Sequence, residues 1–173
     1  MNTCPYCGFE NIPGEDVCDQ CGHSLSSFYP PRPTNELERC LVKDRLNELG
    51  PRSPIVVEPS VPVRQVLRMM VEHRIGCVLI VENSHVIGIF TERDALSKLN
   101  ERADELADHP VKEFMTSSPQ TLDTNSKIAF AVQRMDQGGY RHVPIVDQQG
   151  RATGVISVRD ILRYLTKRLA VEA

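Results

Sequence analysis

Four cysteines near the start of the chain form two pairs with the same spacing. The pairs lie in CPYCG at residues 4–8 and in CDQCG at residues 18–22, with ten residues between the second and third cysteine. Two cysteines three positions apart can hold one metal ion from a tight turn, and the following glycine lets the backbone fold back so that its N–H groups point at the sulfurs. Four thiolates give a closed tetrahedral shell with no position for water or substrate. The pattern therefore predicts a structural metal site on Cys4, Cys7, Cys18 and Cys21.

Zinc is the metal that this spacing favours. Iron can occupy the same four-sulfur shell, but the interval between the pairs suits a zinc ribbon better than a rubredoxin-like iron site. A disulfide framework would need an oxidising compartment, and we expect none because the chain begins without the charged start and apolar core of a signal peptide. Cys40 and Cys77 stand alone in apolar surroundings and are expected to be reduced core residues.

The composition separates a small cysteine-rich head from a larger domain. The 173 residues are 40% hydrophobic and 25% charged with a net charge of −3, which is typical of a cytoplasmic protein. No apolar run is long enough to span a membrane. Residues 24–33 hold three serines and three prolines, the composition of a stiff linker. We therefore expect a zinc ribbon over 1–23, a Ser/Pro-rich linker over 24–34 and one globular domain over the remainder.

The remainder contains one sequence unit twice. GIFTERD at 88–94 lies over GVISVRD at 154–160, VLIVE at 78–82 over VPIVD at 143–147, and VRQVLRMM at 63–70 over IAFAVQRM at 128–135. In each unit the hydrophobic periods predict strand, helix, strand, strand, helix, with a hairpin turn at 82–85 in the first. A further helix is expected over 35–49, ended by Gly50, and the last helices of the two units over 91–99 and 159–169.

This tandem unit resembles a Bateman module, in which two cystathionine-β-synthase (CBS) motifs pack as one pseudo-symmetric domain. The resemblance covers about residues 36–171, and it implies an α+β fold of the CBS type with motifs over 35–107 and 108–173. Members of the family are mostly regulatory and bind adenosine-containing ligands in the cleft between the two motifs. Single pairs commonly associate through their helical faces, so the resemblance also implies a two-fold homodimer through the helices around 66–70, 96–99, 132–135 and 161–165.

A hydroxyl residue stands three positions before an aspartate at the same place in both units, as Thr91 with Asp94 and Ser157 with Asp160. A carboxylate can accept both hydroxyls of a ribose, and a hydroxyl one helical turn earlier lies on the same face. The positive end of the helix also faces anionic groups. The same pattern is a capping box, which stabilises a helix by about 1 kcal/mol without any ligand. Because it occurs twice in register, we favour nucleoside binding, with which capping can coexist.

The resemblance assigns further residues to two candidate clefts. Arg141 and His142 stand where the first unit has Gly76 and Cys77, a place near the ligand phosphates in related modules, or they form a solvated turn before a strand. Gln120 replaces the apolar Ile55, which makes adenine binding less favourable in the Asp94 cleft. The Asp160 cleft is expected to comprise Ser157, Asp160, Arg141, His142, Ser53, Ile55, Ile75 and Gly76, and the other cleft Thr91, Asp94, Ser118, Gln120, Tyr140 and Arg141.

These features predict a non-enzymatic sensor that binds an adenine nucleotide (AMP, ADP or ATP) and signals to a protein partner. The histidines have no matching nucleophile, and no phosphate-cradling loop is present. Residues 1–33 carry four acids against one base, and a four-sulfur zinc centre adds negative charge, so nucleic acid is an unfavourable partner. The ribbon is expected either to dock a protein through Tyr6 and Phe9 or to staple the N-terminus. The alternative is a zinc-ribbon interaction or nucleic-acid adaptor whose CBS pair only dimerises.

Overall fold

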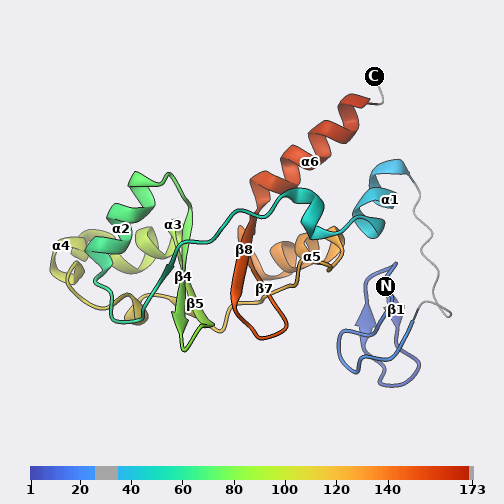
Figure 1. Cartoon of the computed structure of the whole chain (residues 1–173), viewed down its shortest axis with the longest axis horizontal. Helices are drawn as coiled ribbons and strands as arrows, with labels where there is room; N and C mark the ends of the chain where they lie inside the picture. The colour runs from blue at the N-terminus through green and yellow to red at the C-terminus, as the bar shows by residue number, and fades with distance from the viewer. Residues whose placement is uncertain (26–34, 172–173) are drawn as a thin grey trace. The chain divides into compact units, whose positions relative to one another are not determined.

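The computed structural model describes residues 1–25 and 35–171 (Figure 1). The expected linker falls largely outside the described residues, at 26–34. The chain forms two compact units, one of Met1–Gly50, Thr124–Arg141 and Ile156–Ala173, the other of Pro51–Asp123 and His142–Val155. Each unit contains residues of both sequence repeats. We call them the helical unit and the sheet unit.

The sheet unit is built around a four-stranded sheet in the order β3 (Val56–Val57), β4 (Cys77–Glu82), β5 (His85–Thr91), β6 (Thr116–Ser117). β3 lies parallel to β4, and the other pairs are antiparallel. Between β3 and β4 runs α2 (Val63–Glu72), whose buried Val63, Val66 and Met70 share one core cluster with Phe90 of β5. The apolar residues predicted at helical spacing therefore form the buried face of α2.

The turn between β4 and β5 is the predicted hairpin. Glu82 pairs with His85, and the two residues between them, Asn83 and Ser84, have φ of 50° and 68°. Two consecutive left-handed residues are what a two-residue type I′ turn requires, and this turn matches the twist of the flanking strands. A second hairpin, β7 (His142–Val146) with β8 (Ala152–Ser157), occupies the corresponding place in the second repeat.

The helix predicted over 91–99 is present, but only its first part is α-helical. α3 (Glu92–Asp94) is followed by a π-helical turn, η2 (Ala95–Leu99), and Asn100 then takes a left-handed φ of 50°. The chain continues through η3 (Asn100–Arg102), α4 (Ala103–Leu106) and η4 (Val111–Glu113) to β6. A π turn inserts an extra residue per turn, so Lys98 and Leu99 are rotated from the positions that a regular α-helix would give them.

The helical unit contains the cysteine-rich head, with β1 (Asn2–Thr3) paired to β2 (Glu10–Asn11), and the helices α1 (Glu36–Lys43), η1 (Leu46–Leu49), α5 (Ile128–Gly138) and α6 (Val158–Val171). The single helix predicted over 35–49 is wrong. α1 ends at Lys43 because Arg45 is extended and forms a β-bridge with Lys127, and Leu46 begins a separate 3-10 helix. Gly50, with a φ of 63°, ends that helix as predicted.

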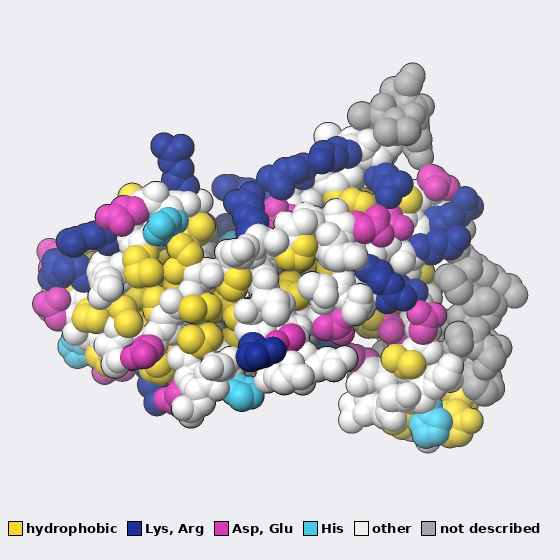
Figure 2. Space-filling view, in the orientation of Figure 1, with side chains coloured by type: hydrophobic (Ala, Val, Ile, Leu, Met, Phe, Trp, Pro, Cys, Tyr) yellow, Lys and Arg dark blue, Asp and Glu magenta, His cyan; other side chains and the backbone are white. Residues whose placement is uncertain are grey.

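The last helix, α6, begins one residue before the predicted start and runs to the end of the described residues (Figure 1, red). It buries Ile161 and Tyr164. Basic side chains lie along its exposed side (Figure 2), namely Arg159, Arg163, Lys167 and Arg168. Among the described residues, no helix combines the length and the apolar character that crossing a bilayer requires.

Candidate functional site

The four predicted cysteines converge. Their Sγ atoms all lie within 4.8 Å of one another, with 3.7 Å between Cys4 and Cys21 and 3.6 Å between Cys7 and Cys18. A tetrahedron of sulfurs about 2.3 Å from a zinc ion has edges of about 3.8 Å, whereas a disulfide requires about 2.05 Å. The donor set therefore fits a four-sulfur zinc site and not a pair of disulfides.

The glycine after each cysteine pair has the conformation expected of it. Gly8 and Gly22 have φ of 75° and 73°, and their N–H groups donate to the carbonyl oxygens of Cys4 and Cys18 at 2.9 and 2.8 Å. Both turns thus fold back in the same way, which brings the two pairs of sulfurs to one point.

Hydrogen bonds at Cys18 favour its thiolate form. Burial raises the pKa of its thiol, but hydrogen bonds from the backbone N–H groups of Cys21 and Gln20 outweigh burial and lower that pKa to about 6. The side-chain amide of Asn11 also donates to this sulfur, at 3.6 Å. A thiolate is the metal-binding form of cysteine, so these donors favour a metal ligand at this position.

The head contacts basic residues of its own unit. Asp16 lies 3.3 Å from Lys127, at the start of α5, and Asp19 lies 3.3 Å from Arg134 within that helix. The neighbouring Glu15 has a buried Oε2 that no hydrogen-bond donor among the described residues reaches, and burial raises the pKa of Glu15 to about 7. Two of the acidic side chains of the head, Asp16 and Asp19, therefore form ion pairs with basic residues of this chain.

The predicted pair Ser157 and Asp160 lies at the junction of β8 and α6. The backbone N–H and the hydroxyl of Ser157 donate to Oδ2 of Asp160 at 2.9 and 2.6 Å, and Arg163 donates to Oδ1 at 2.9 Å. The Asp160 side chain is 3% exposed, while that of Arg163 is 51% exposed. Arg141 lies beside this helix start, since its carbonyl accepts the N–H of Val158 at 3.0 Å. A buried carboxylate, a hydroxyl and a cation thus meet at one helix N-terminus.

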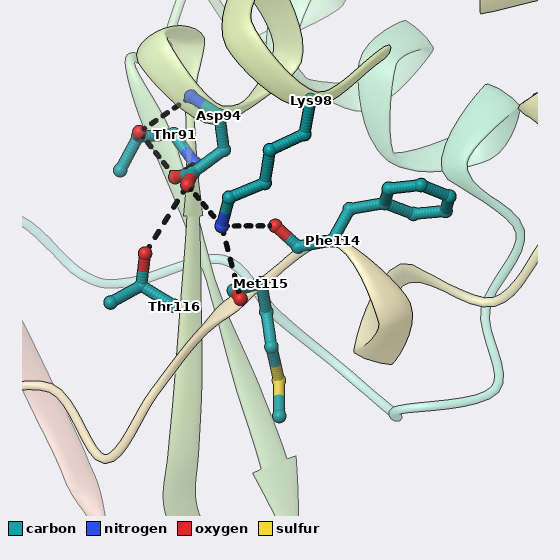
Figure 3. Close-up of polar contacts among 6 residues, drawn as sticks. All are labelled: Thr91, Asp94, Lys98, Phe114, Met115 and Thr116. Carbon is teal, nitrogen blue, oxygen red and sulfur yellow. Dashed lines mark hydrogen bonds and ion pairs between the residues drawn. The ribbon is translucent and has the colours of Figure 1, made fainter.

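In the matching pair, Thr91 bonds Asp94 in the same way as Ser157 bonds Asp160 (Figure 3). The N–H and hydroxyl of Thr91 donate to Oδ2 of Asp94 at 2.9 and 2.5 Å. Its Oδ1, however, accepts from Lys98 at 2.6 Å and from the hydroxyl of Thr116 at 3.2 Å. Burial raises the pKa of Asp94, but the ammonium of Lys98 and the hydrogen bonds from Thr91 lower it below its ordinary value.

Two further predicted residues lie together in the sheet unit. The ring of His142 packs against Gly76, so that a Cβ atom there would lie 2.8 Å from two ring atoms. Glu92 donates its N–H to the Gly76 carbonyl at 3.1 Å, the counterpart of the bond between Val158 and Arg141. Position 76 therefore accepts no larger residue while this histidine keeps its place.

The other predicted residues lie near the surface of their units. Ser53, Ser118, Gln120 and Tyr140 are exposed, and Ile55 and Ile75 are half-buried. Ile55 accepts the N–H of Leu79 at the sheet edge, and Ser118 donates to Ile87 from a left-handed φ of 48°. Their assignment to ligand contacts stays a prediction.

Lys98 and Thr116 are the polar residues of this region that the sequence reasoning missed. A signal for Lys98 was present, because a lysine four residues after an aspartate can pair with it on a helix. No local signal existed for Thr116, which comes from the second repeat and reaches Asp94 because β6 pairs with β5.

Comparison with known proteins agrees with this architecture. The family model of the CBS domain matches residues 47–101 and again 111–167. An uncharacterized 17.7 kDa protein of Acidianus ambivalens is 29% identical over 122 residues, which cover 70% of this chain and 73% of that protein. In several other curated relatives the matched part is smaller, 19–22% of the whole protein.

Solved structures match the same part of the chain. A CBS-domain protein from Agrobacterium tumefaciens aligns with a TM-score of 0.62 and 30% identity, over 72% of this chain and 98% of the other. A CBS-domain protein from Pyrobaculum aerophilum, solved in complex with AMP, aligns with a TM-score of 0.62 and 26% identity, over 73% of this chain and 98% of the other. The chain therefore belongs to the CBS-domain family and carries a pair of CBS repeats preceded by four clustered cysteines.

Proposed function

We propose that this chain is a regulatory protein, not an enzyme, which binds an adenine nucleotide through its CBS pair and passes the signal to a protein partner. The observation that carries the proposal is the buried carboxylate of Asp160, positioned by Ser157 at the start of α6. A carboxylate held in this way can accept the two hydroxyls of a ribose. The guanidinium of its partner Arg163 is 51% exposed, so water can hydrate that cation when a ligand takes its place.

The ligand is proposed to be an adenine nucleotide with at least one phosphate. The Pyrobaculum protein that this chain resembles was solved with AMP, which supports that class. The backbone of Arg141 lies beside the start of α6, so we propose that its guanidinium meets the phosphate there, where the N-terminus of α6 also favours an anion.

The proposed metal of the head is zinc in a structural role. The sulfur spacing fits a zinc tetrahedron, and four thiolates leave no coordination position for substrate. The head's proposed task is to fix the N-terminal segment, since Asp16 and Asp19 pair with bases of α5 in the same unit. Tyr6, stacked on His23 with 3.9 Å between ring centroids and 61% exposed, remains available to a protein partner.

We further propose a cytoplasmic homodimer. Val71 at the end of α2, Leu96 in η2 and Leu162 in α6 are 78%, 79% and 55% exposed. All three lie on or beside the helices that the family resemblance assigns to a dimer face. A contiguous apolar patch is typical of a surface that a partner covers, and we propose that each of these side chains contributes to such a surface.

A thermal-shift series tests the proposed ligand. The intact protein is heated with AMP, ADP, ATP or S-adenosylmethionine, with 2′-deoxy-AMP and CMP as matched controls. AMP at 100 times its Kd should stabilise the fold by about 2.7 kcal/mol, and 2′-deoxy-AMP, which lacks one hydroxyl for Asp160, should stabilise it less at the same concentration. Equal shifts with AMP and CMP would contradict adenine recognition, and no shift with any ligand would favour the adaptor whose CBS pair only dimerises.

A further inference from the structure

We propose that Lys98 closes the Asp94 position to ribose, so that the chain uses only one of its two matching aspartates for a nucleotide. This inference rests on the proposed function and assigns specificity within it. The two aspartates have equivalent hydroxyl partners, Thr91 and Ser157, and they differ in what holds the second carboxylate oxygen.

The ammonium of Lys98 has an acceptor for each of its three N–H groups. Nζ lies 2.6 Å from Oδ1 of Asp94, 2.8 Å from the carbonyl oxygen of Phe114 and 3.2 Å from that of Met115 (Figure 3). A lysine has three donors and no acceptor, so these contacts use its full capacity. Lys98 thereby connects Asp94, at the end of α3, to the residues that precede β6.

Asp94 is correspondingly occupied from within the chain. Oδ2 accepts twice from Thr91, and Oδ1 accepts from Lys98 and from Thr116. A ribose that approached this carboxylate would have to replace an ion pair by a hydrogen bond from a neutral hydroxyl, and it would leave the ammonium without its counter-ion. The Asp94 side chain is 10% exposed and that of Lys98 37%, so water replaces only part of what the ammonium would lose.

The second repeat lacks this closure. Tyr164 follows Asp160 by four residues, as Lys98 follows Asp94, but its hydroxyl donates to Asp44 instead. Arg168 pairs with the same Asp44 at 2.7 Å. Oδ1 of Asp160 accepts instead from Arg163, whose side chain is 51% exposed, against 37% for Lys98.

Titration calorimetry with AMP on the intact chain tests the inference. The wild type should bind a single AMP per chain, and Lys98→Ala should gain a second, weaker site. Lys98→Met, which keeps the apolar stem, should gain the same site if Ala destabilises the fold. Adding Asp94→Ala to either variant should abolish the gain. The matched control is Lys112→Ala, an exposed lysine of the same unit, which should leave the stoichiometry unchanged.

The possible failures are distinguishable. Two AMP molecules bound by the wild type, or a single site retained by both folded Lys98 variants, would overturn the role of Lys98 while leaving nucleotide binding intact. No AMP binding by the wild type or any variant would contradict the proposed function and the inference with it.

Discussion

Lys98 pairs with Asp94, with Nζ 2.6 Å from Oδ1; the aspartate side chain is 10% exposed and that of the lysine 37%, and the second repeat has no lysine at the matching place. The repeats keep the hydroxyl and the aspartate in register, yet residue 98 is lysine and its counterpart, Tyr164, is a phenol directed at Asp44. Asp94 is thus bonded to a lysine that also holds two backbone carbonyls, while Asp160 pairs with Arg163. Duplication followed by divergence of this kind leaves two similar positions with different capacities.

Removing the lysine should destabilise the fold more than removing the arginine of the matching position. Lys98→Ala leaves a buried carboxylate and two carbonyls short of a donor, so we expect a loss of about 1–3 kcal/mol in the free energy of unfolding. Arg163→Ala also takes a donor from a buried carboxylate, but it leaves no backbone carbonyl without its lysine donor, so the loss should be smaller. Urea unfolding of the two variants at neutral pH measures both values, and equal losses would contradict the structural role of Lys98.

The stability difference between wild type and Lys98→Ala should depend on pH. The pKa of Asp94 is lowered in the folded protein from its ordinary value of 3.8, so its ionised form stabilises the fold above that value. This contribution is lost as the pH falls through the lowered pKa. The difference should therefore be full at pH 6–7 and shrink below about pH 4. Urea unfolding at a series of pH values checks this, and a constant difference would contradict it.

The cysteine-rich head should lose its metal and its fold together. Protein purified reduced and without chelator should contain about one zinc ion per chain, and Cys4→Ser should release it. The CBS repeats should stay folded, because their buried strands and helices do not depend on the head. Elemental analysis with near- and far-ultraviolet circular dichroism provides the measurement. Cys40→Ser, at a buried cysteine outside the cluster, is the control that should retain zinc. Iron in place of zinc would revise the metal, and no metal would refute the site.

How far the sequence predicts this molecule depends on whether a feature is local. The cysteine turns, the hairpin at Asn83 and Ser84 and the pairing of Thr91 with Asp94 are all set by residues within a few positions of one another. Spacing and residue type therefore sufficed to predict them. The pairing of β6 with β5, by contrast, joins residues of different repeats, and no local pattern encodes it.

The errors have the same origin. The expected helix over 35–49 contains a good helical pattern, but Arg45 pairs with Lys127, which is distant in sequence. The expected helix over 91–99 likewise gives way to a π turn at the residues where Lys98 bonds the carbonyls of Phe114 and Met115. In both places tertiary contacts override a favourable local propensity.

Glu15→Gln should stabilise the protein, and more so as the pH rises. Burial raises the pKa of Glu15 to about 7 from an ordinary value of 4.5, so the folded protein holds a proton that the unfolded chain has already lost. The wild type therefore loses stability between those two pH values, whereas glutamine has no such dependence. Bound zinc with four thiolates adds negative charge nearby and acts in the same direction. Melting temperatures at pH 5 and pH 8 test this, and a gain that is equal at both would contradict it.

Substitution of Leu96, the exposed leucine of η2, should disrupt the proposed dimer. We expect a dimeric mass by light scattering at micromolar concentration and a monomeric mass for Leu96→Glu, because a buried carboxylate in an apolar interface is costly. Val17→Glu, at an exposed apolar residue of the head, is the matched control and should stay dimeric. A monomeric wild type, or a dimeric Leu96→Glu, would contradict the proposed face.

The most direct test is calorimetric titration of AMP into Asp160→Ala and Asp94→Ala, each compared with the wild type. Asp160→Ala removes the acceptor of the ribose hydroxyls and should lose about 1.5–3 kcal/mol of binding per hydrogen bond, at least a tenfold rise in Kd. Asp94→Ala should lower the melting temperature, because Lys98 loses its counter-ion, and yet keep an AMP affinity close to that of the wild type. An unchanged Kd in Asp160→Ala, or equal losses in the two variants, would contradict the assignment of the nucleotide to Asp160.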